Sequence, residues 1–204
     1  MKEANTMPRF ILASQSPRRR ELLTQIGVGE FTILVPDADE SYDPTLSPQE
    51  IVCSICRKKV EAAAALAGDD DAVIIAADTM VFLDGLRLGK PTDEADAAKM
   101  LRSLSGRTHT VCTGVSIARG RQIETEAETT AVTFRDLTDA EISAYIASGD
   151  PMDKAGSYGI QGKPALFVSG IAGDYFNVMG LPLHRLGQML KKFNVDLFCE
   201  EAQT

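Results

Sequence analysis

Residues 14–20, Ser-Gln-Ser-Pro-Arg-Arg-Arg, place three consecutive arginines directly after two hydroxyl side chains. Ser16 is a good N-cap residue and Pro17 suits the first helical position, so we expect a helix to begin there. Cations in that first turn are unfavourable, because the N-terminus of a helix already carries partial positive charge. Such a cluster of cations is favourable if it binds an anion together with the backbone N–H groups and the hydroxyls. At most two of the guanidinium groups can face one ligand, and phosphate is a suitable anion. The alternative is a solvated basic turn or a Ser-Pro phosphorylation site.

A second candidate is an aspartate at the end of a predicted buried strand. The apolar residues 73–77 predict a central strand, and Asp78 follows them directly. Ligands of open α/β sheets bind beyond the carboxyl ends of strands, where a carboxylate can position a metal or act as a base. A hairpin turn at residues 84–85 would put Lys90 opposite Thr79, next to this carboxylate. That arrangement suits phosphate and metal chemistry, although a turn-capping aspartate or a plain salt bridge would look the same.

Two weaker signals lie elsewhere. Lys59 sits at the edge of the apolar face of a predicted helix, where it either reaches water or covers a phosphate cleft. The glycine-rich residues 153–162 permit a ligand close to the backbone, and Gln161 has the paired donor and acceptor that read a nucleobase edge. A flexible surface loop is the alternative there.

An acidic loop offers further oxygen ligands. Asp37, Asp39 and Glu40 are each able to complete a magnesium site together with substrate phosphates. Unless that loop folds over the cleft, a solvated run of charges is the simpler interpretation.

Several chemistries are excluded by residue types and spacing. Cys53 and Cys56 match C-x-x-C, but they fall inside a helical pattern and are interpreted as two core-facing residues one turn apart. Residues 88–91 are not a phosphate-binding P-loop, because the first glycine and the final hydroxyl residue are missing. His109 and His184 are the only histidines, so a histidine-rich metal site is impossible.

Composition narrows the class of protein. The chain has 204 residues, 44% of them hydrophobic, which indicates one compact domain or two small lobes. A net charge of −8 argues against general nucleic-acid binding. The longest apolar run, residues 72–77, is far shorter than the ~20 residues of a membrane-spanning helix. The N-terminus lacks the apolar core of a signal peptide, so we expect a cytoplasmic protein with free thiols.

Strands and helices interleave along the chain, which predicts an α/β protein with a mixed sheet. The predicted strands are residues 10–13, 31–35, 73–77, 86–89, 108–118, 124–134, 165–170 and 174–179. The predicted helices begin at residues 17, 48, 92, 138 and 182. Asp78 and the arginine turn then both follow buried strands.

Residues 11–23, ILASQSPRRRELL, resemble the opening signature of the Maf family of nucleoside triphosphate pyrophosphatases. The resemblance continues in order, from about Phe10 to Phe193, through residues 39–40, 59, 77–79, 89–91, 104–106, 153–156, 159–162 and 180–183. It implies a mixed β-sheet with flanking helices and two lobes around a central cleft, similar to the inosine triphosphate pyrophosphatases. A single domain over residues 10–193 would then lie between a mobile leader, 1–9, and a tail, 194–204.

The resemblance also implies an activity and a site. The activity is metal-dependent hydrolysis of the α–β phosphate bond, with Mg²⁺, Mn²⁺ or Co²⁺ as cofactor. Residues 78–79 together with 160–162 look like the branch that acts on dTTP and UTP, with modified pyrimidine nucleotides as further candidates. The implied catalytic residue is Asp78; the phosphate ligands are Ser14, Arg18, Arg19, Lys59 and Lys90; the base-specificity residues are Arg18, Thr79 and Gln161; the metal ligands are Glu40 and Asp78.

The expected partners are a small-molecule nucleotide and a second copy of the chain in a homodimer, with no nucleic acid and no membrane. A nucleotide-binding regulator of cell division or septum formation, without significant turnover, is the alternative function. A binding pocket and a catalytic pocket share most of these residues, so the sequence leaves both open.

Overall fold

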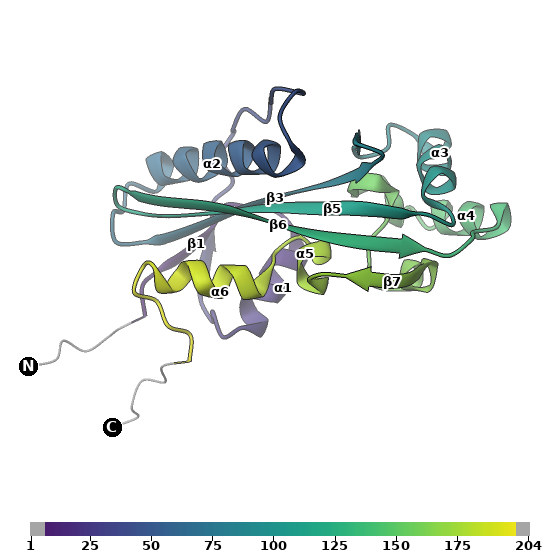
Figure 1. Ribbon diagram of the computed structural model, residues 1–204. Coiled ribbons are helices and arrows are strands. Elements are labelled where there is room, and N and C mark those ends of the chain that lie inside the picture. Colours follow the sequence, from purple (N-terminus) through teal and green to yellow (C-terminus); the bar gives the residue numbers. More distant parts are fainter. Residues whose placement is uncertain (1–6, 199–204) are drawn as a thin grey trace, which may run out of the picture.

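The computed structural model describes residues 7–198 and shows a long twisted sheet with helices on both faces (Figure 1). The strands are β1 (Phe10–Leu12), β2 (Phe31–Ile33), β3 (Val73–Leu83), β4 (Leu86–Leu88), β5 (Thr108–Arg119), β6 (Gln122–Phe134) and β7 (Val168–Ala172). The helices are α1 (Pro17–Gln25), α2 (Pro48–Ala67), α3 (Glu94–Leu104), α4 (Asp139–Ile146), α5 (Tyr175–Met179) and α6 (Leu183–Lys191). Short 3-10 turns cover Asp150–Asp153, Ala155–Ser157 and Lys163–Phe167.

The sheet order is β2-β1-β3-β5-β6-β7, with β4 paired to β3. β1 runs parallel to β2 and β3, and the remaining pairs are antiparallel. Figure 1 shows α2 on one face of the sheet and α1 and α6 on the other, with α3 and α4 at its far end. The predicted α/β class with a mixed sheet and flanking helices is confirmed.

One edge of β3 is covered only at its two ends. β1 pairs with residues 73–75 of this edge, and β4 pairs with residues 81–83. β5 pairs with residues 74–82 on the opposite edge, which is nearly the whole strand. On the edge of β3 that faces away from β5, no strand of the described chain pairs with the interval between, residues 76–80. Asp78 and Thr79 lie in this interval, so their side chains, which leave opposite faces of the sheet, both reach the same open edge.

Two hydrophobic cores flank this interval. The first packs β1 and the start of β3 against α1 and α6, and its fully buried members include Leu12, Ile75 and Leu186. The second packs the end of β3 against α3 and α4, through residues such as Leu101 and Ile142. The gap in the strand edge therefore lies between two separately packed ends of the molecule.

Three element predictions need correction. Residues 174–179 form helix α5 instead of a strand, because the Asp174 side chain accepts the Phe176 N–H as an N-cap. The strand predicted at 165–170 begins only at residue 168, after a 3-10 turn that opens with Lys163 and Pro164. β3 does not end before Asp78 but continues to residue 83, because β5 pairs with it almost throughout.

The predicted leader and tail fall largely on residues 1–6 and 199–204, which lie outside the described residues. Across residues 7–198 no helix combines the length and apolarity that crossing a membrane requires.

Candidate active site

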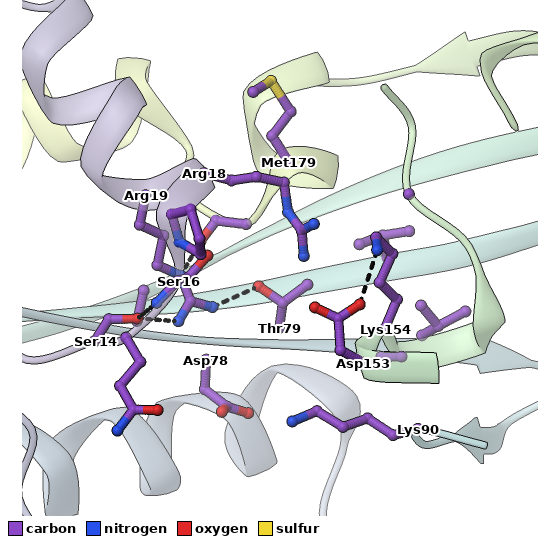
Figure 2. Close-up of a pocket in the computed structure, with 18 of the residues that line it drawn as sticks. Ser14, Ser16, Arg18, Arg19, Asp78, Thr79, Lys90, Asp153, Lys154 and Met179 are labelled. Carbon is purple, nitrogen blue, oxygen red and sulfur yellow. Dashed lines mark hydrogen bonds and ion pairs between the residues drawn. The ribbon is translucent and has the colours of Figure 1, made fainter. Parts of the chain in front are cut away.

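A cavity of about 750 Å³ opens at the uncovered edge of β3. The turn before α1, the middle of β3, the residues after β4, the segment around residues 153–160 and the end of α5 form its walls (Figure 2). The lining contains these residues predicted from the sequence: Ser14, Arg18, Arg19, Glu40, Lys59, Asp78, Thr79 and Lys90. Gln161 is exposed and does not belong to the lining, although its neighbours Gly159 and Ile160 do.

The start of α1 leaves its first turn open. Ser16 holds the N-cap position, as predicted, but its side chain makes no capping hydrogen bond. Its backbone N–H donates instead to the hydroxyl of Ser14 (3.2 Å). The N-terminal N–H groups of α1 therefore keep donor capacity for an anion in the cavity.

The three arginines separate in space. Arg18 and Arg19 line the cavity, whereas Arg20 donates to the carbonyl of Gln15 (2.8 Å). This agrees with the expectation that at most two of them face one ligand.

Arg19 links three parts of the wall. Its Nε donates to the Gly180 carbonyl (2.7 Å), its Nη1 to Ser14 Oγ (3.0 Å) and its Nη2 to Thr79 Oγ1 (3.1 Å). All three acceptors are neutral. Loss of bulk water lowers the pKa of this guanidinium, and the nearby charge of Asp78 partly opposes that effect. Arg19 thus holds the phosphate turn, β3 and the end of α5 in one arrangement.

A lysine on α2 joins two carboxylates. Lys59 Nζ lies 2.7 Å from Asp78 Oδ1 and 2.8 Å from Glu40 Oε1. Lys59 and Asp78 are each 16% exposed, and Glu40 is 63% exposed. Burial alone would lower the pKa of Lys59, but the two carboxylates together raise it. The hydrogen bond from Lys59 also lowers the pKa of Glu40, so this lysine stays charged at neutral pH.

The position of Lys59 follows from how α2 is built. A capping box between Ser47 and Glu50 fixes the start of the helix. The buried face of α2 packs on the sheet through residues that include Ile51 and Ile55. Lys59 continues this row one turn further, at the edge of the buried face, and so reaches the cavity as the sequence allowed.

Lys90 is a further cation of the cavity and, unlike Lys59, makes no ion pair within residues 7–198. The hairpin register agrees with prediction, since Val81 pairs with Leu88 and Leu83 with Leu86. The ladder ends at residue 88, so Lys90 lies just beyond it. Figure 2 shows its ammonium pointing toward Asp78 from the side opposite α1.

The donor set for a metal is small. Within residues 7–198 there is no group of three or more His, Cys, Asp or Glu side chains arranged around one point. Glu40 and Asp78, both in contact with Lys59, are carboxylates that face the cavity. Asp39 instead contacts Lys58 (3.0 Å) and the Ser41 hydroxyl (2.6 Å). Two carboxylates fit a hard divalent cation that takes its other ligands from substrate phosphates and water.

The other half of the cavity is apolar. It is lined by Val81, Val111, Tyr158, Ile160, Val178 and Met179. Thr79 lies on the same face of β3 as Val81, so its hydroxyl is a polar group at the border of this half. Asp153 and Lys154 also line the cavity and form an ion pair with each other (2.8 Å). They belong to the glycine-rich segment that the sequence singled out.

Sequence reasoning missed the polar groups behind Thr79. Thr113 on β5 and Asn177 on α5 are fully buried and joined to it by hydrogen bonds. In the sequence, Thr113 is only a polar residue within a predicted strand, and Asn177 lies in a segment that was also predicted as a strand. A local sequence pattern does not distinguish such residues from polar residues at the surface.

Fold and cavity together define an α/β protein whose ligand site joins a cationic half to an apolar half. Residues 9–193 match the family model described as Maf-like protein, and the chain belongs to the Maf family.

Curated relatives support this placement, and a solved structure supports the fold. A Bacillus cereus protein named dTTP/UTP pyrophosphatase is 49% identical over 96% of this chain and 95% of its own length. A Moorella thermoacetica protein of the same name is 51% identical over 94% of this chain and 98% of its own. The structure of a HAM1 protein from Coxiella burnetii resembles the fold with a TM-score of 0.52 at 15% identity, covering 91% of this chain and all of that one.

Proposed function

We propose that the protein is a nucleoside triphosphate pyrophosphatase that acts on dTTP and UTP, with modified pyrimidine nucleotides as further candidates. It releases a nucleoside monophosphate and pyrophosphate. The observation that carries the proposal is the bridge of Lys59 between Asp78 and Glu40 inside the cationic half of the cavity. The names of the B. cereus and M. thermoacetica relatives support the same substrates.

In this proposal the two halves of the cavity divide the substrate. The triphosphate lies against the turn before α1, Lys59 and Lys90, where ammonium and N–H groups offset its charge. The base occupies the apolar half near Thr79 and Arg18. Gln161, exposed on the neighbouring loop, would reach the base only after that loop moves inward.

Asp78 is assigned the central chemical role. Its carboxylate accepts a proton from a water whose oxygen attacks phosphorus, and the bond from that phosphorus to the bridging oxygen breaks as pyrophosphate leaves. Lys59 and Lys90 offset the charge on the phosphate oxygens throughout the step. A bound Mg²⁺, Mn²⁺ or Co²⁺, held by Glu40 and Asp78 with phosphate oxygens, would supply further charge neutralisation.

The test is pyrophosphate release from dTTP, UTP, CTP, 7-methyl-GTP, dATP and ITP, with magnesium or manganese. We expect release from dTTP and UTP. Asp78→Asn should lower turnover by at least about 1,000-fold, because general-base catalysis and charge placement are lost together. The melting temperature of the variant should remain near that of the wild type.

Two outcomes would contradict the proposal. Normal turnover in Asp78→Asn would remove the assigned base. If the wild type releases pyrophosphate from none of these nucleotides, but a nucleotide still raises its melting temperature, the result would favour a regulatory protein that binds nucleotides without hydrolysing them. The homodimer expected from the sequence is part of this proposal, and light scattering on the same samples tests it.

A further inference from the structure

The hydroxyl of Thr79 belongs to a buried chain of hydrogen bonds that leads away from the cavity. Arg19 Nη2 donates to Thr79 Oγ1 (3.1 Å). Thr79 Oγ1 lies 3.0 Å from Thr113 Oγ1, and Thr113 Oγ1 lies 2.9 Å from the main-chain oxygen of Asn177. Thr113 and Asn177 are both completely buried. Water therefore has no access to rearrange the inner part of this chain.

The far end of the chain is fixed by main-chain contacts. The N–H of Gly180 donates to the same Asn177 oxygen (3.0 Å). The Asn177 side chain donates to the Val111 carbonyl (3.0 Å) and to Thr130 Oγ1 (2.9 Å). The Asn177 oxygen consequently has one position, at the inner end of the chain.

The direction of every proton in this chain follows from the chemistry of its ends. A carbonyl oxygen only accepts, so Thr113 must donate its single hydroxyl proton to Asn177. Thr113 then has no proton left for Thr79, and Thr79 must donate its own proton to Thr113. A guanidinium only donates, so Arg19 occupies one lone pair of Thr79. Thr79 is left with one free lone pair and no proton for a ligand.

The apolar half of the cavity therefore meets an acceptor at Thr79 and never a donor. Uracil and thymine carry an N3–H donor, whereas cytosine carries a lone pair at N3. If N3 of the base approaches Thr79, uracil or thymine donates a hydrogen bond to the hydroxyl oxygen. With cytosine, the lone pair at N3 faces the lone pair of Thr79, and the two repel each other. A site built in this way rejects the mismatched base strongly, because a polar group is left unpaired in a buried place.

We propose that Thr113, with the main-chain oxygen of Asn177, is a specificity-determining positioning residue that fixes the Thr79 hydroxyl as an acceptor and thereby selects uracil and thymine over cytosine. This inference rests on the proposed function only for the class of ligand. Thr113 acts through Thr79 and does not touch the substrate.

The first test compares Thr113→Val with Thr113→Ser by kcat/KM for UTP and CTP. Valine removes the acceptor, so the Thr79 proton can turn toward the cavity and bond to N3 of cytosine. We expect the ratio of UTP to CTP to fall at least about tenfold, mainly through a lower KM for CTP. Serine keeps the hydroxyl and should hold the ratio within about twofold.

The matched control is Ser116→Ala. Ser116 is a fully buried hydroxyl residue on the same strand, bonded to Thr125 (2.7 Å) and away from the cavity. Ser116→Ala should lower the stability of the fold without changing the ratio of kcat/KM for UTP to that for CTP. If Thr113→Val lowers kcat/KM for UTP and CTP in parallel, Thr113 is merely structural and the proposal fails.

The second test uses only the wild type and no turnover. Calorimetry without divalent metal compares the binding of UTP, CTP and 3-methyl-UTP, which keeps both uracil carbonyl groups but lacks N3–H. We expect 3-methyl-UTP and CTP each to bind at least about tenfold more weakly than UTP.

Equal binding of UTP and CTP would overturn the proposal even if the enzyme hydrolyses UTP. If the wild type hydrolyses nothing but prefers UTP in this experiment, the proposed activity fails. The role of Thr113 then stands if Thr113→Val loses this preference in the same calorimetry, and it fails if the variant keeps it.

Discussion

At the scale of single residues, two lysines of the cavity have different surroundings and should differ in effect. Lys59 neutralises both Asp78 and Glu40 at contact distance. Lys90 makes no ion pair within residues 7–198 and extends into the cavity from the end of β4. Lys59 therefore stabilises the folded structure and also belongs to the site, whereas Lys90 is available only to bind a ligand.

Lys59→Met should therefore affect folding and catalysis together. The free energy of unfolding should fall by about 2 kcal/mol, because two carboxylates then lack their shared counter-charge. The value of kcat/KM should fall about 100-fold. Lys90→Met should raise the KM for the triphosphate about tenfold with unfolding unchanged. Urea unfolding and steady-state kinetics measure both effects, and equal destabilisation by the two substitutions would contradict this division.

At the scale of elements, the contact between α2 and the sheet depends on a residue without a side chain. A Cβ at Gly114 of β5 would lie 2.6 Å from the Val52 carbonyl oxygen and 3.0 Å from Cys56 Sγ. The Cys56 thiol donates to the Gly114 carbonyl (3.0 Å). Because α2 carries Lys59, its distance from the sheet also fixes one wall of the active site.

Gly114→Ala should push α2 away from β5 and destabilise the fold by about 3 kcal/mol, as overpacking of a close backbone contact does. Activity of the folded fraction should fall as well, since Lys59 moves with the helix. Gly187→Ala is the matched control: Gly187 lies in α6 with nothing within 4 Å of an added Cβ. It should be neutral or stabilise by about 0.5–1 kcal/mol. A neutral Gly114→Ala in urea unfolding would refute this packing argument.

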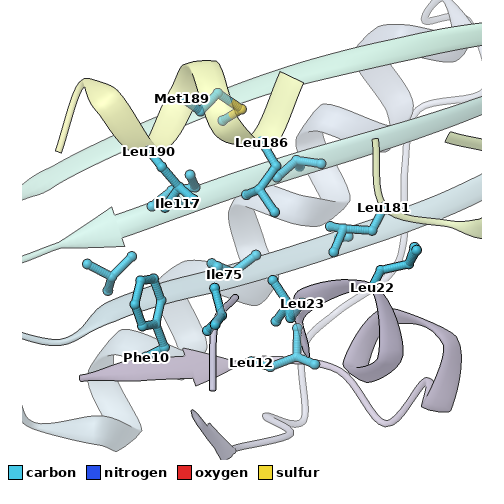
Figure 3. Close-up of a cluster of buried hydrophobic side chains, with 14 of the residues drawn as sticks. Phe10, Leu12, Leu22, Leu23, Ile75, Ile117, Leu181, Leu186, Met189 and Leu190 are labelled. Atoms are coloured by element: carbon cyan, nitrogen blue, oxygen red, sulfur yellow. The ribbon is translucent and has the colours of Figure 1, made fainter. Parts of the chain in front are cut away.

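The elements also show what a sequence can and cannot predict. Continuous apolar runs identified β1 and the start of β3, which are buried throughout. Alternating residues identified β5 and β6, although β5 is buried along most of its length. Helix α1 followed from Ser16, Pro17 and the pair Leu22 and Leu23. The structure buries this pair in one cluster with Leu181 and Leu186 (Figure 3). Helix α5 was missed because five residues are too few to display a helical period.

At the scale of the whole molecule, the site depends on topology as much as on residue type. The sequence identified Asp78, the arginine turn and Lys90 because each follows a short local pattern. It did not predict that β1 and β4 leave residues 76–80 uncovered between them, and this gap is what lets both faces of β3 reach one cavity. Thr113 and Asn177 were missed for the same reason: only the paired strands and α5 bring them behind Thr79.

The stability of the whole molecule should also depend on one buried imidazole. His109 is 2% exposed, its Nε2 lies 2.6 Å from the Tyr158 hydroxyl, and the rings of Phe134 and Tyr158 meet it edge-on. Its Nδ1 has no hydrogen-bond partner within residues 7–198. Burial lowers the pKa of His109 from 6.5 to about 4. The folded state thus keeps this ring neutral where the unfolded chain binds a proton.

The sign of the pH effect follows from this difference. Below pH 6.5 the imidazole of His109 is protonated in the unfolded chain, but in the folded state it stays neutral until about pH 4. Acid therefore favours unfolding between these two pH values. His109 should remove about 3 kcal/mol of the free energy of unfolding between pH 7 and pH 4. His109→Gln should lose correspondingly less over the same range in urea unfolding, whereas His184→Gln, at an exposed position on α6, should follow the wild type. Parallel curves for the wild type and His109→Gln would mean that the buried ring accepts its proton without a cost to the fold.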